Sequence, residues 1–240
     1  MSREIRAVLF DLDGTLLDTL SDIATAMNTA LAAHGLPTHP VDAYRRMVGS
    51  GAEVLVRRAL SECGERRGEA ASDDLVASVL RLMKREYASH PVSQTCPYPG
   101  ILHAVAELAE LAIPLAVLSN KPDELVEPIL AEFFARGTFS VARGHVTGLP
   151  RKPDPAGARA IASELEVPAR QCLYLGDSDV DVHTALNAGM VAIGAAWGFR
   201  GSAELIEAGA QRVINDPGEL APLVRSYMVY TGGADIGRTD

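Results

Sequence analysis

Apolar residues of this chain gather in short runs, and most runs end abruptly at polar residues or glycine. Such runs are typical of buried β-strands. We predict strands over residues 5–10, 114–118, 139–142, 171–175, 191–195 and 212–214. Between most of them the spacing is helical, over residues 101–112, 124–135, 156–166, 180–188 and 203–208. Strands that alternate with helices indicate a parallel sheet covered on both faces, so we expect a doubly wound α/β fold.

Residues 20–88 interrupt this alternation, because their apolar spacing indicates helices only. The predicted helices span residues 22–33, 52–63 and 74–88, and a proline-containing stretch leads back to the sheet. We therefore predict a core formed by residues 1–17 and 92–226 and an inserted all-helical cap domain of residues 18–91. Residues 227–240 contain three glycines and are expected to fray.

Composition and charge narrow the possible partners. Of the 240 residues 48% are apolar, which is enough for a sizeable core, and the net charge of −9 argues against nucleic-acid binding. Three cysteines without CxxC spacing do not form the pattern of a disulfide framework or a zinc site. The uncharged stretch 184–199 is shorter than the ~20 residues of a membrane span. We predict a cytoplasmic monomer or homodimer with no membrane and no nucleic-acid partner.

Polar side chains follow the first four predicted strands. The carboxyl ends of parallel strands meet at one edge of a sheet, where α/β proteins bind ligands. The residues there are Asp11, Asp13 and Gly14 after the first strand, Ser119, Asn120 and Lys121 after the second, Lys152 after the third, and Asp177 and Asp181 after the fourth. We expect them to form a single site.

The carboxylates at this edge would repel each other unless a cation compensates for their charge. Oxygen ligands suit a hard ion, and Mg²⁺ prefers one or two carboxylates together with water and phosphate oxygens. Lys152 adds a fixed positive charge, and the hydroxyl of Ser119 can donate to a phosphate oxygen. Lysine is rare here, since only Lys84, Lys121 and Lys152 occur among 22 basic residues. The pattern predicts a site for Mg²⁺ and a phosphate group.

Asp11 and Asp13 are two positions apart in an extended segment, so their side chains point to the same side. One carboxylate can then attack phosphorus while the other exchanges a proton with the leaving-group oxygen.

Several of these residues also allow purely structural interpretations. Ser119 and Asn120 could form an ordinary strand-to-helix cap. Asp179 could favour a helix N-terminus through the helix dipole. Ser50 and Gly51 could belong to a flexible connection between helices or to a lid that contacts the leaving group.

Four motifs in order resemble those of haloacid dehalogenase-like (HAD) phosphatases. They are Asp11-Leu12-Asp13-Gly14-Thr15, Leu118-Ser119-Asn120-Lys121, Lys152-Pro153-Asp154-Pro155 and Gly176-Asp177-Ser178-Asp179-Val180-Asp181. The resemblance covers about residues 5–224 and implies a Rossmann-like core with an inserted helical cap.

The resemblance also implies residue roles. Asp11 would be the nucleophile that forms an aspartyl phosphate, and Asp13 the general acid–base. Ser119 and Lys152 would bind the phosphate and stabilise the transition state. Dehalogenases of this superfamily lack the second aspartate, so Asp13 favours phosphoryl chemistry.

For the metal, the resemblance implies that Asp177 ligates Mg²⁺ together with Asp11 and the backbone carbonyl of Asp13. Asp181 would support this site as a ligand or as a hydrogen-bond acceptor. The other expected site residues are Gly14, Asn120, Ser50 and Gly51 for phosphate or substrate binding, and Lys121 in a supporting role.

Further segments resemble the phosphoglycolate phosphatase branch of the family, namely residues 48–52, 58–60, 98–100, 197–199 and 208–210. Residues 144–148 depart from the acidic loop of many relatives. The expected substrate is a small phosphate ester, foremost 2-phosphoglycolate. A ribose- or nucleoside-type 5′-phosphate, or a biosynthetic intermediate, is the alternative.

Two other functions compete with hydrolysis. A sugar phosphomutase of this family would carry a histidine and a basic residue in the cap near the first motif, and no histidine lies between Asp18 and Ala33. A phosphate-binding or partner-binding module of the receiver-domain type would carry its aspartate after a later strand. In this chain the paired aspartates follow the first strand, and a module of that type would leave the large helical insertion unexplained.

Overall fold

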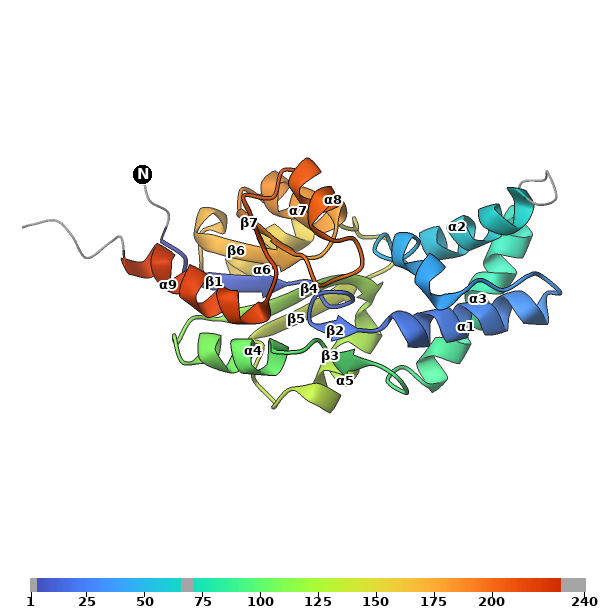
Figure 1. Cartoon of the computed structure of the whole chain (residues 1–240), viewed down its shortest axis with the longest axis horizontal. Helices are drawn as coiled ribbons and strands as arrows, with labels where there is room; N and C mark the ends of the chain where they lie inside the picture. Colours follow the sequence, from blue (N-terminus) through green and yellow to red (C-terminus); the bar gives the residue numbers. More distant parts are fainter. Residues whose placement is uncertain (1–3, 66–70, 230–240) are drawn as a thin grey trace, which may run out of the picture.

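The core of the protein, seen in a computed structural model, is a six-stranded parallel sheet of order β5-β4-β1-β6-β7-β8 (Figure 1). The structure describes residues 4–65 and 71–229. The strands are β1 (Ala7–Phe10), β4 (Leu115–Pro122), β5 (Val141–His145), β6 (Cys172–Gly176), β7 (Val191–Ala195) and β8 (Arg212–Ile214). The predicted doubly wound sheet is confirmed. Because β1 lies between β4 and β6, the ends of these three strands form the crevice in which such sheets bind ligands.

Strand β1 is buried on both faces, since all four of its residues are apolar. Val8 and Phe10 join one apolar cluster, while Ala7 and Leu9 join the cluster on the opposite face. The first face is covered by α4 (Ile101–Ala109), α5 (Asp123–Phe133) and α9 (Leu220–Val229), and the second by α6 (Ala156–Glu164), α7 (Asp179–Ala188) and α8 (Ser202–Glu207). Figure 1 shows α7 and α8 on one side of the sheet and α4 on the other.

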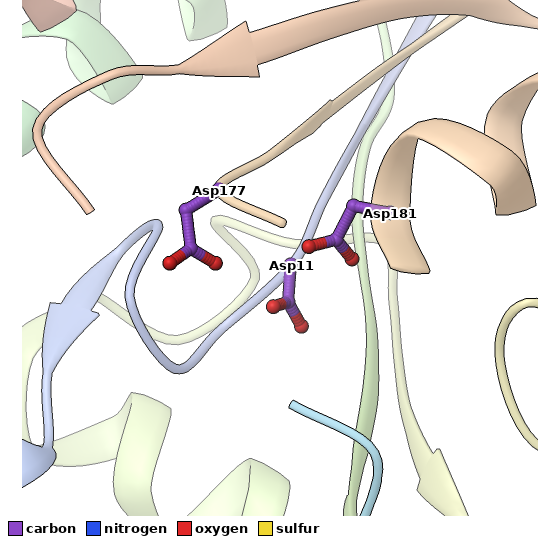
Figure 2. A group of neighbouring side chains, drawn as sticks. All are labelled: Asp11, Asp177 and Asp181. Atoms are coloured by element: carbon purple, nitrogen blue, oxygen red, sulfur yellow. The ribbon is translucent and has the colours of Figure 1, made fainter. Parts of the chain in front are cut away.

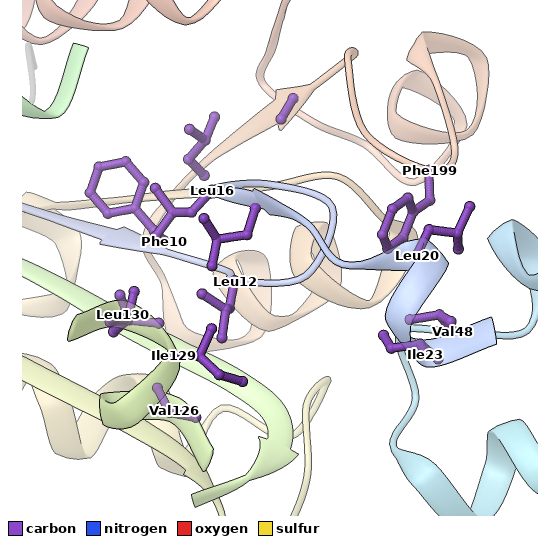
Figure 3. Close-up of a cluster of buried hydrophobic side chains, with 14 of the residues drawn as sticks. Phe10, Leu12, Leu16, Leu20, Ile23, Val48, Val126, Ile129, Leu130 and Phe199 are labelled. Atoms are coloured by element: carbon purple, nitrogen blue, oxygen red, sulfur yellow. The ribbon is translucent and has the colours of Figure 1, made fainter. Parts of the chain in front are cut away.

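The inserted helices lie beyond one end of the sheet (Figure 1). They are α1 (Leu20–Ala33), the 3-10 helix η1 (Val41–Arg46), α2 (Ala52–Glu65) and α3 (Asp73–Ser89). Met27, Tyr44, Val56 and Val79 are fully or almost fully buried among them. The buried cluster continues into the sheet. Figure 3 shows Leu20 beside Phe199 and Ile23 beside Val48, where the cap meets the core.

A two-stranded antiparallel ribbon connects the two parts, formed by β2 (Leu17–Asp18) and β3 (Cys96–Pro97). Beside it, the buried carboxylate of Asp22 accepts hydrogen bonds from the backbone N–H groups of Gln94 and Thr95 and from the Thr95 hydroxyl. The start of α1 is thereby tied to the returning chain. The division of the chain at residues 18 and 92 remains a prediction.

Several elements differ from the sequence-based prediction. β4 continues through residues 119–122, which were expected to be a loop, because β5 still pairs with Pro122 after an irregular register beyond Leu118. The ribbon β2–β3 and the 3-10 helices η1, η2 (Ala169–Gln171) and η3 (Pro217–Glu219) were not predicted. α9 extends to Val229, and the remainder of the expected frayed tail, residues 230–240, lies outside the described residues.

Candidate active site

Three buried carboxylates meet at the ends of β1 and β6. Figure 2 shows Asp11, Asp177 and Asp181 pointing into one space, and oxygen atoms of the three lie within 4.8 Å of one another. Asp11 directly follows β1, Asp177 directly follows β6, and Asp181 lies in the first turn of α7. The parallel arrangement of the strands brings together residues that are more than 160 positions apart.

Lys152 links two of these carboxylates. Its ammonium Nζ donates to Oδ1 of Asp11 and to Oδ1 of Asp181, over 2.7 Å in each case. A third contact runs 3.1 Å from Nζ to the hydroxyl of Tyr174, which itself donates to the backbone carbonyl of Leu118. All three donor positions of the ammonium are therefore in use.

The pKa values reflect crowding of negative charge. Burial, reinforced by the neighbouring Asp181 carboxylate, raises the pKa of Asp11 to about 7 in spite of the lysine. Burial and the carboxylates of Asp181 and Asp11 raise the pKa of Asp177 well above its usual range. Burial alone would lower the pKa of Lys152, but Asp11 and Asp181 raise it well above its usual range, so the lysine is charged. One lysine among three carboxylates leaves the site in need of a cation.

The donor set fits a hard divalent cation. Asp177 takes no part in the lysine contacts, and it accepts the backbone N–H of Phe199 over 2.7 Å. Buried oxygen atoms within 4.8 Å of one another are close to the ~4.2 Å that separates opposite ligands of octahedral Mg²⁺. The three buried carboxylates therefore suit a divalent ion.

Glycine is required beside Asp177. Gly14 has a φ of +93°, and a Cβ atom there would overlap the Asp177 carboxylate. A Cβ atom at Gly198 would overlap the same side chain from another direction. Gly14 thus allows the loop after β1 to approach Asp177 closely, which side chains at this position would prevent.

Asp13 has a different cationic partner. Its Oδ1 accepts from Nζ of Lys121 over 2.7 Å, and the ring of Tyr87 from cap helix α3 lies 4.5 Å from the same Nζ. Burial opposes the charge of Lys121, but the Asp13 carboxylate and Tyr87 raise the pKa of the lysine above its usual range. The carboxylate of Asp13 therefore pairs with Lys121, whereas the carboxylates of Asp11 and Asp181 contact Lys152.

Ser119 and Asn120 lie between these two lysine sites. The Ser119 hydroxyl accepts a hydrogen bond from the backbone N–H of Lys121 over 3.2 Å. Ser119 also lines a cavity between the cap and the core, which is described below. The Asn120 amide donates to the backbone carbonyls of Gly49 and Lys152 and accepts the backbone N–H of Lys152. Asn120 was expected to bind phosphate; instead its side chain contacts backbone groups.

The cap approaches the core through its residues 47–51, here named the cap loop. The core residues Arg200 and Asn120 donate to the carbonyls of Val48 and Gly49, over 2.9 and 3.0 Å. Ser50 was expected to contact substrate. In the structure its hydroxyl accepts a hydrogen bond from the guanidinium of Arg58 in α2. Gly51 lines the cavity between the cap and the core, and its contact with substrate stays a prediction.

A cavity of about 70 Å³ lies between the cap and the core. At ~10–15 Å³ per water molecule this volume has room for several water molecules. Asp11, Asp13 and Ser119 line its polar end, and Lys84 and Lys121 also border it. Its apolar wall is formed mainly by the cap side chains of Ile23, Val48, Leu55, Met83 and Tyr87.

Four functional contacts escaped the sequence analysis. Tyr174 lies within an apolar strand, and Tyr87 lies in an amphipathic helix, so neither position stands out. Arg200 is one of many arginines. The N–H of Phe199 carries no sequence signal, because every residue except proline has one.

In the part of the chain that the structure describes, no helix combines the length and the apolar composition required to cross a membrane.

The comparisons with known proteins agree with this geometry. A family model for haloacid dehalogenase-like hydrolases matches residues 5–189. The chain is 36% identical over 217 residues to a phosphoglycolate phosphatase of Pseudomonas savastanoi pv. phaseolicola, covering 90% of this chain and 79% of that one. A phosphoglycolate phosphatase of Mannheimia succiniciproducens is 30% identical over 224 residues, covering 93% and 100%.

A solved structure shows the same fold. The crystal structure of a predicted phosphoglycolate phosphatase from Haemophilus somnus superposes with a TM-score of 0.85 at 26% identity. It covers 92% of this chain and 98% of its own, so the similarity includes the core and the inserted helices.

Proposed function

The chain belongs to the haloacid dehalogenase-like hydrolases and is a phosphatase, and we propose that it hydrolyses 2-phosphoglycolate through a phosphorylated Asp11. One observation carries the proposal: buried Asp11 lies 2.7 Å from Lys152 at the end of β1 and borders a small cavity that Asp13 also lines. A nucleophile, a proton donor and a fixed positive charge thus surround space for a small phosphate ester.

The substrate proposal has a separate basis in the cavity. Its volume of about 70 Å³ suits a small ester, and the relatives described above are named phosphoglycolate phosphatases. Lys84 of α3 borders the cavity, and the described residues place no carboxylate in an ion pair with it. An exposed ammonium at the edge of an apolar wall suits a short leaving group that ends in a carboxylate.

In the first step, a carboxylate oxygen of Asp11 attacks phosphorus, and the bond from phosphorus to the ester oxygen breaks. Asp13 gives its proton to that oxygen, so the leaving group departs as an alcohol. In the second step, a water molecule loses a proton to Asp13 and attacks the aspartyl phosphate. Inorganic phosphate leaves, and both Asp11 and protonated Asp13 are restored.

Residues around the phosphoryl group stabilise its charge. Lys152 supplies a fixed positive charge beside the phosphoryl group, the Ser119 hydroxyl can donate to one of its oxygens, and Lys121 orients the Asp13 carboxylate. Asp177, Asp11 and the Asp13 carbonyl would hold Mg²⁺, with Asp181 in support. The ion supplies positive charge that offsets both the carboxylates and the phosphoryl oxygens. A cytoplasmic location and a monomeric or homodimeric state remain predictions.

Phosphate release by the purified protein with Mg²⁺ tests this function. The panel contains 2-phosphoglycolate, ribose 5-phosphate, nucleoside monophosphates and p-nitrophenyl phosphate, and Asp11→Asn is the inactive control. We expect the highest kcat/KM for 2-phosphoglycolate. Preference for a pentose or nucleoside phosphate would overturn the substrate but keep the mechanism. Release that survives in Asp11→Asn would overturn the mechanism.

A further inference from the structure

The amide of Asn120 joins two segments that are far apart in the chain. Its Nδ2 donates to the carbonyl of Gly49 in the cap loop over 3.0 Å and to the carbonyl of Lys152 over 3.1 Å. Its Oδ1 accepts the backbone N–H of Lys152 over 3.0 Å. The residue is buried, with 7% of its surface exposed.

These contacts satisfy the amide. An asparagine side chain offers two N–H donors and one carbonyl oxygen, and here each has a backbone partner. The orientation is determined by those partners, because the reversed amide would place its oxygen against two carbonyl oxygens. The side chain therefore holds backbone in place and has no N–H left for a phosphate.

The two contacts to Lys152 hold the main chain from which the ammonium extends. At its far end, Nζ is held by Asp11, Asp181 and Tyr174. A shift of the Lys152 backbone would move Nζ relative to these partners and to the phosphoryl group. The contact to Gly49 can form only when the cap loop lies against the core.

We propose that Asn120 is a positioning residue that couples closure of the cap to the placement of Lys152. With the cap loop in place, three hydrogen bonds fix the amide, and the amide fixes the backbone of Lys152. When the cap loop leaves, Asn120 loses one of its three partners, and Lys152 is held less firmly. This inference rests on the proposed role of Lys152 in binding the phosphoryl group.

Arg200 offers a matched comparison within the same chain. It donates to the carbonyl of Val48, the neighbour of Gly49 in the cap loop, over 2.9 Å. Among the described residues its ion-pair partner is Glu204. Arg200 therefore tethers the cap loop as Asn120 does, while its partners do not include Lys152.

The test measures two properties of the whole protein with Mg²⁺ present. Calorimetry gives the affinity for inorganic phosphate, and small-angle scattering gives the radius of gyration as a measure of cap opening. The proteins are wild type, Asn120→Ala, Asn120→Asp, Arg200→Met and Lys152→Met. Asn120→Asp keeps the size and the acceptor for the Lys152 N–H but removes both donors. Circular dichroism confirms that each variant is folded.

We expect Arg200→Met and both Asn120 variants to increase the radius of gyration. Phosphate affinity should fall ~10-fold in the Asn120 variants and by a smaller factor in Arg200→Met, where the cap loop opens but Asn120 keeps both contacts to Lys152. With substrate, kcat should fall in the Asn120 variants, whereas Arg200→Met should mainly raise KM.

Two results would overturn the coupling: wild-type phosphate affinity in an Arg200→Met protein whose radius of gyration has increased, or a closed cap in both Asn120 variants. Failure of the underlying function has a different signature. If Lys152→Met binds phosphate as tightly as wild type, then the proposed role of Lys152 is wrong, and the coupling is rejected with it.

Discussion

Lys121 and Asp13 lie 108 positions apart and form an ion pair with 2.7 Å between Nζ and Oδ1. Both side chains are largely buried, and Tyr87 of the cap lies over the lysine. The core therefore holds the proposed general acid–base with one lysine and the proposed nucleophile with another. This separation allows the two aspartates to take different roles, although they are only two residues apart.

Replacement of Lys121 should impair proton transfer to the leaving group. In Lys121→Met we expect kcat for alkyl phosphates to fall ~10–100-fold, which is a part of the ~10²–10⁴-fold that general acid–base catalysis contributes. p-Nitrophenyl phosphate should be affected less, because its leaving group departs without a proton. Steady-state kinetics on both esters measures the ratio. Asp13→Asn should show the same bias, and equal losses on both esters would contradict the role of Lys121.

Removal of divalent ions should make stability depend on pH. The folded-state pKa values of Asp11, about 7, and of Asp177 lie above their usual ranges. Above the ordinary pKa of 3.8 the folded protein binds more protons than the unfolded chain, so its stability falls as the pH rises from there to the raised values. A bound cation offsets this loss. Calorimetry should therefore show a larger increase in Tm on adding Mg²⁺ at pH ~8 than at pH ~5.5.

Asp177→Asn is the control for that effect. Asparagine can still accept the N–H of Phe199 but removes one buried charge. At pH ~8 the metal-free variant should melt above metal-free wild type, and Mg²⁺ should add little. A variant that gains as much from Mg²⁺ as wild type would show that Asp177 is not a ligand.

Lys84 should set the preference for an acidic leaving group. In Lys84→Met we expect KM for 2-phosphoglycolate to rise ~10–100-fold, the equivalent of the ~1.5–3 kcal/mol of a charged hydrogen bond. Kinetics with ethyl phosphate, whose leaving group is uncharged, should change less than ~2-fold. Arg85→Met on the same helix is the matched control, because Arg85 is exposed and paired with Glu86. An unchanged KM for 2-phosphoglycolate would refute the assignment.

Tyr174→Phe should weaken both stability and catalysis. The hydroxyl accepts from Lys152 and donates to the Leu118 carbonyl, so its loss should cost about 1–3 kcal/mol of unfolding free energy. We also expect kcat/KM to fall about 5- to 10-fold, because Lys152 loses a partner. Denaturant unfolding and steady-state kinetics measure the two effects.

Tyr44→Phe is the control for the general effect of removing a buried tyrosine hydroxyl, as distinct from the loss of the contact with Lys152. The Tyr44 hydroxyl donates to Asn28 over 2.6 Å in the cap, and the residue is as buried as Tyr174. This variant should lose similar stability but keep its kcat/KM. If both variants lose activity equally, then the loss reflects destabilisation and not the contact with Lys152.

Much of the site follows from local sequence. Asp11 and Asp177 directly follow apolar strands, and the order of strands and helices predicts that these strands end at the same edge. The position of Asp181 in the first turn of a helix is also a local property. The sheet and the inserted helices were predictable for the same reason, since periodicity depends on neighbouring residues.

The pairings of the lysines depend on tertiary structure. Lys121 and Lys152 both follow predicted strands, and nothing in the sequence shows which carboxylate each of them meets. In the structure Lys121 contacts Asp13, and Lys152 contacts Asp11 and Asp181. Asn120 was expected to bind phosphate. In the structure its amide donates a hydrogen bond to the carbonyl of Gly49, which the cap loop brings to the core.

The sequence by itself determined which residues lie at the strand ends and that their charges require a cation. Only the tertiary structure decided which donor meets which acceptor, because a hydrogen bond depends on distances of a few tenths of an ångström between segments far apart in the chain. Tyr174, Tyr87 and Arg200 act through such distances, so their roles became visible only once the cap and the core were in place.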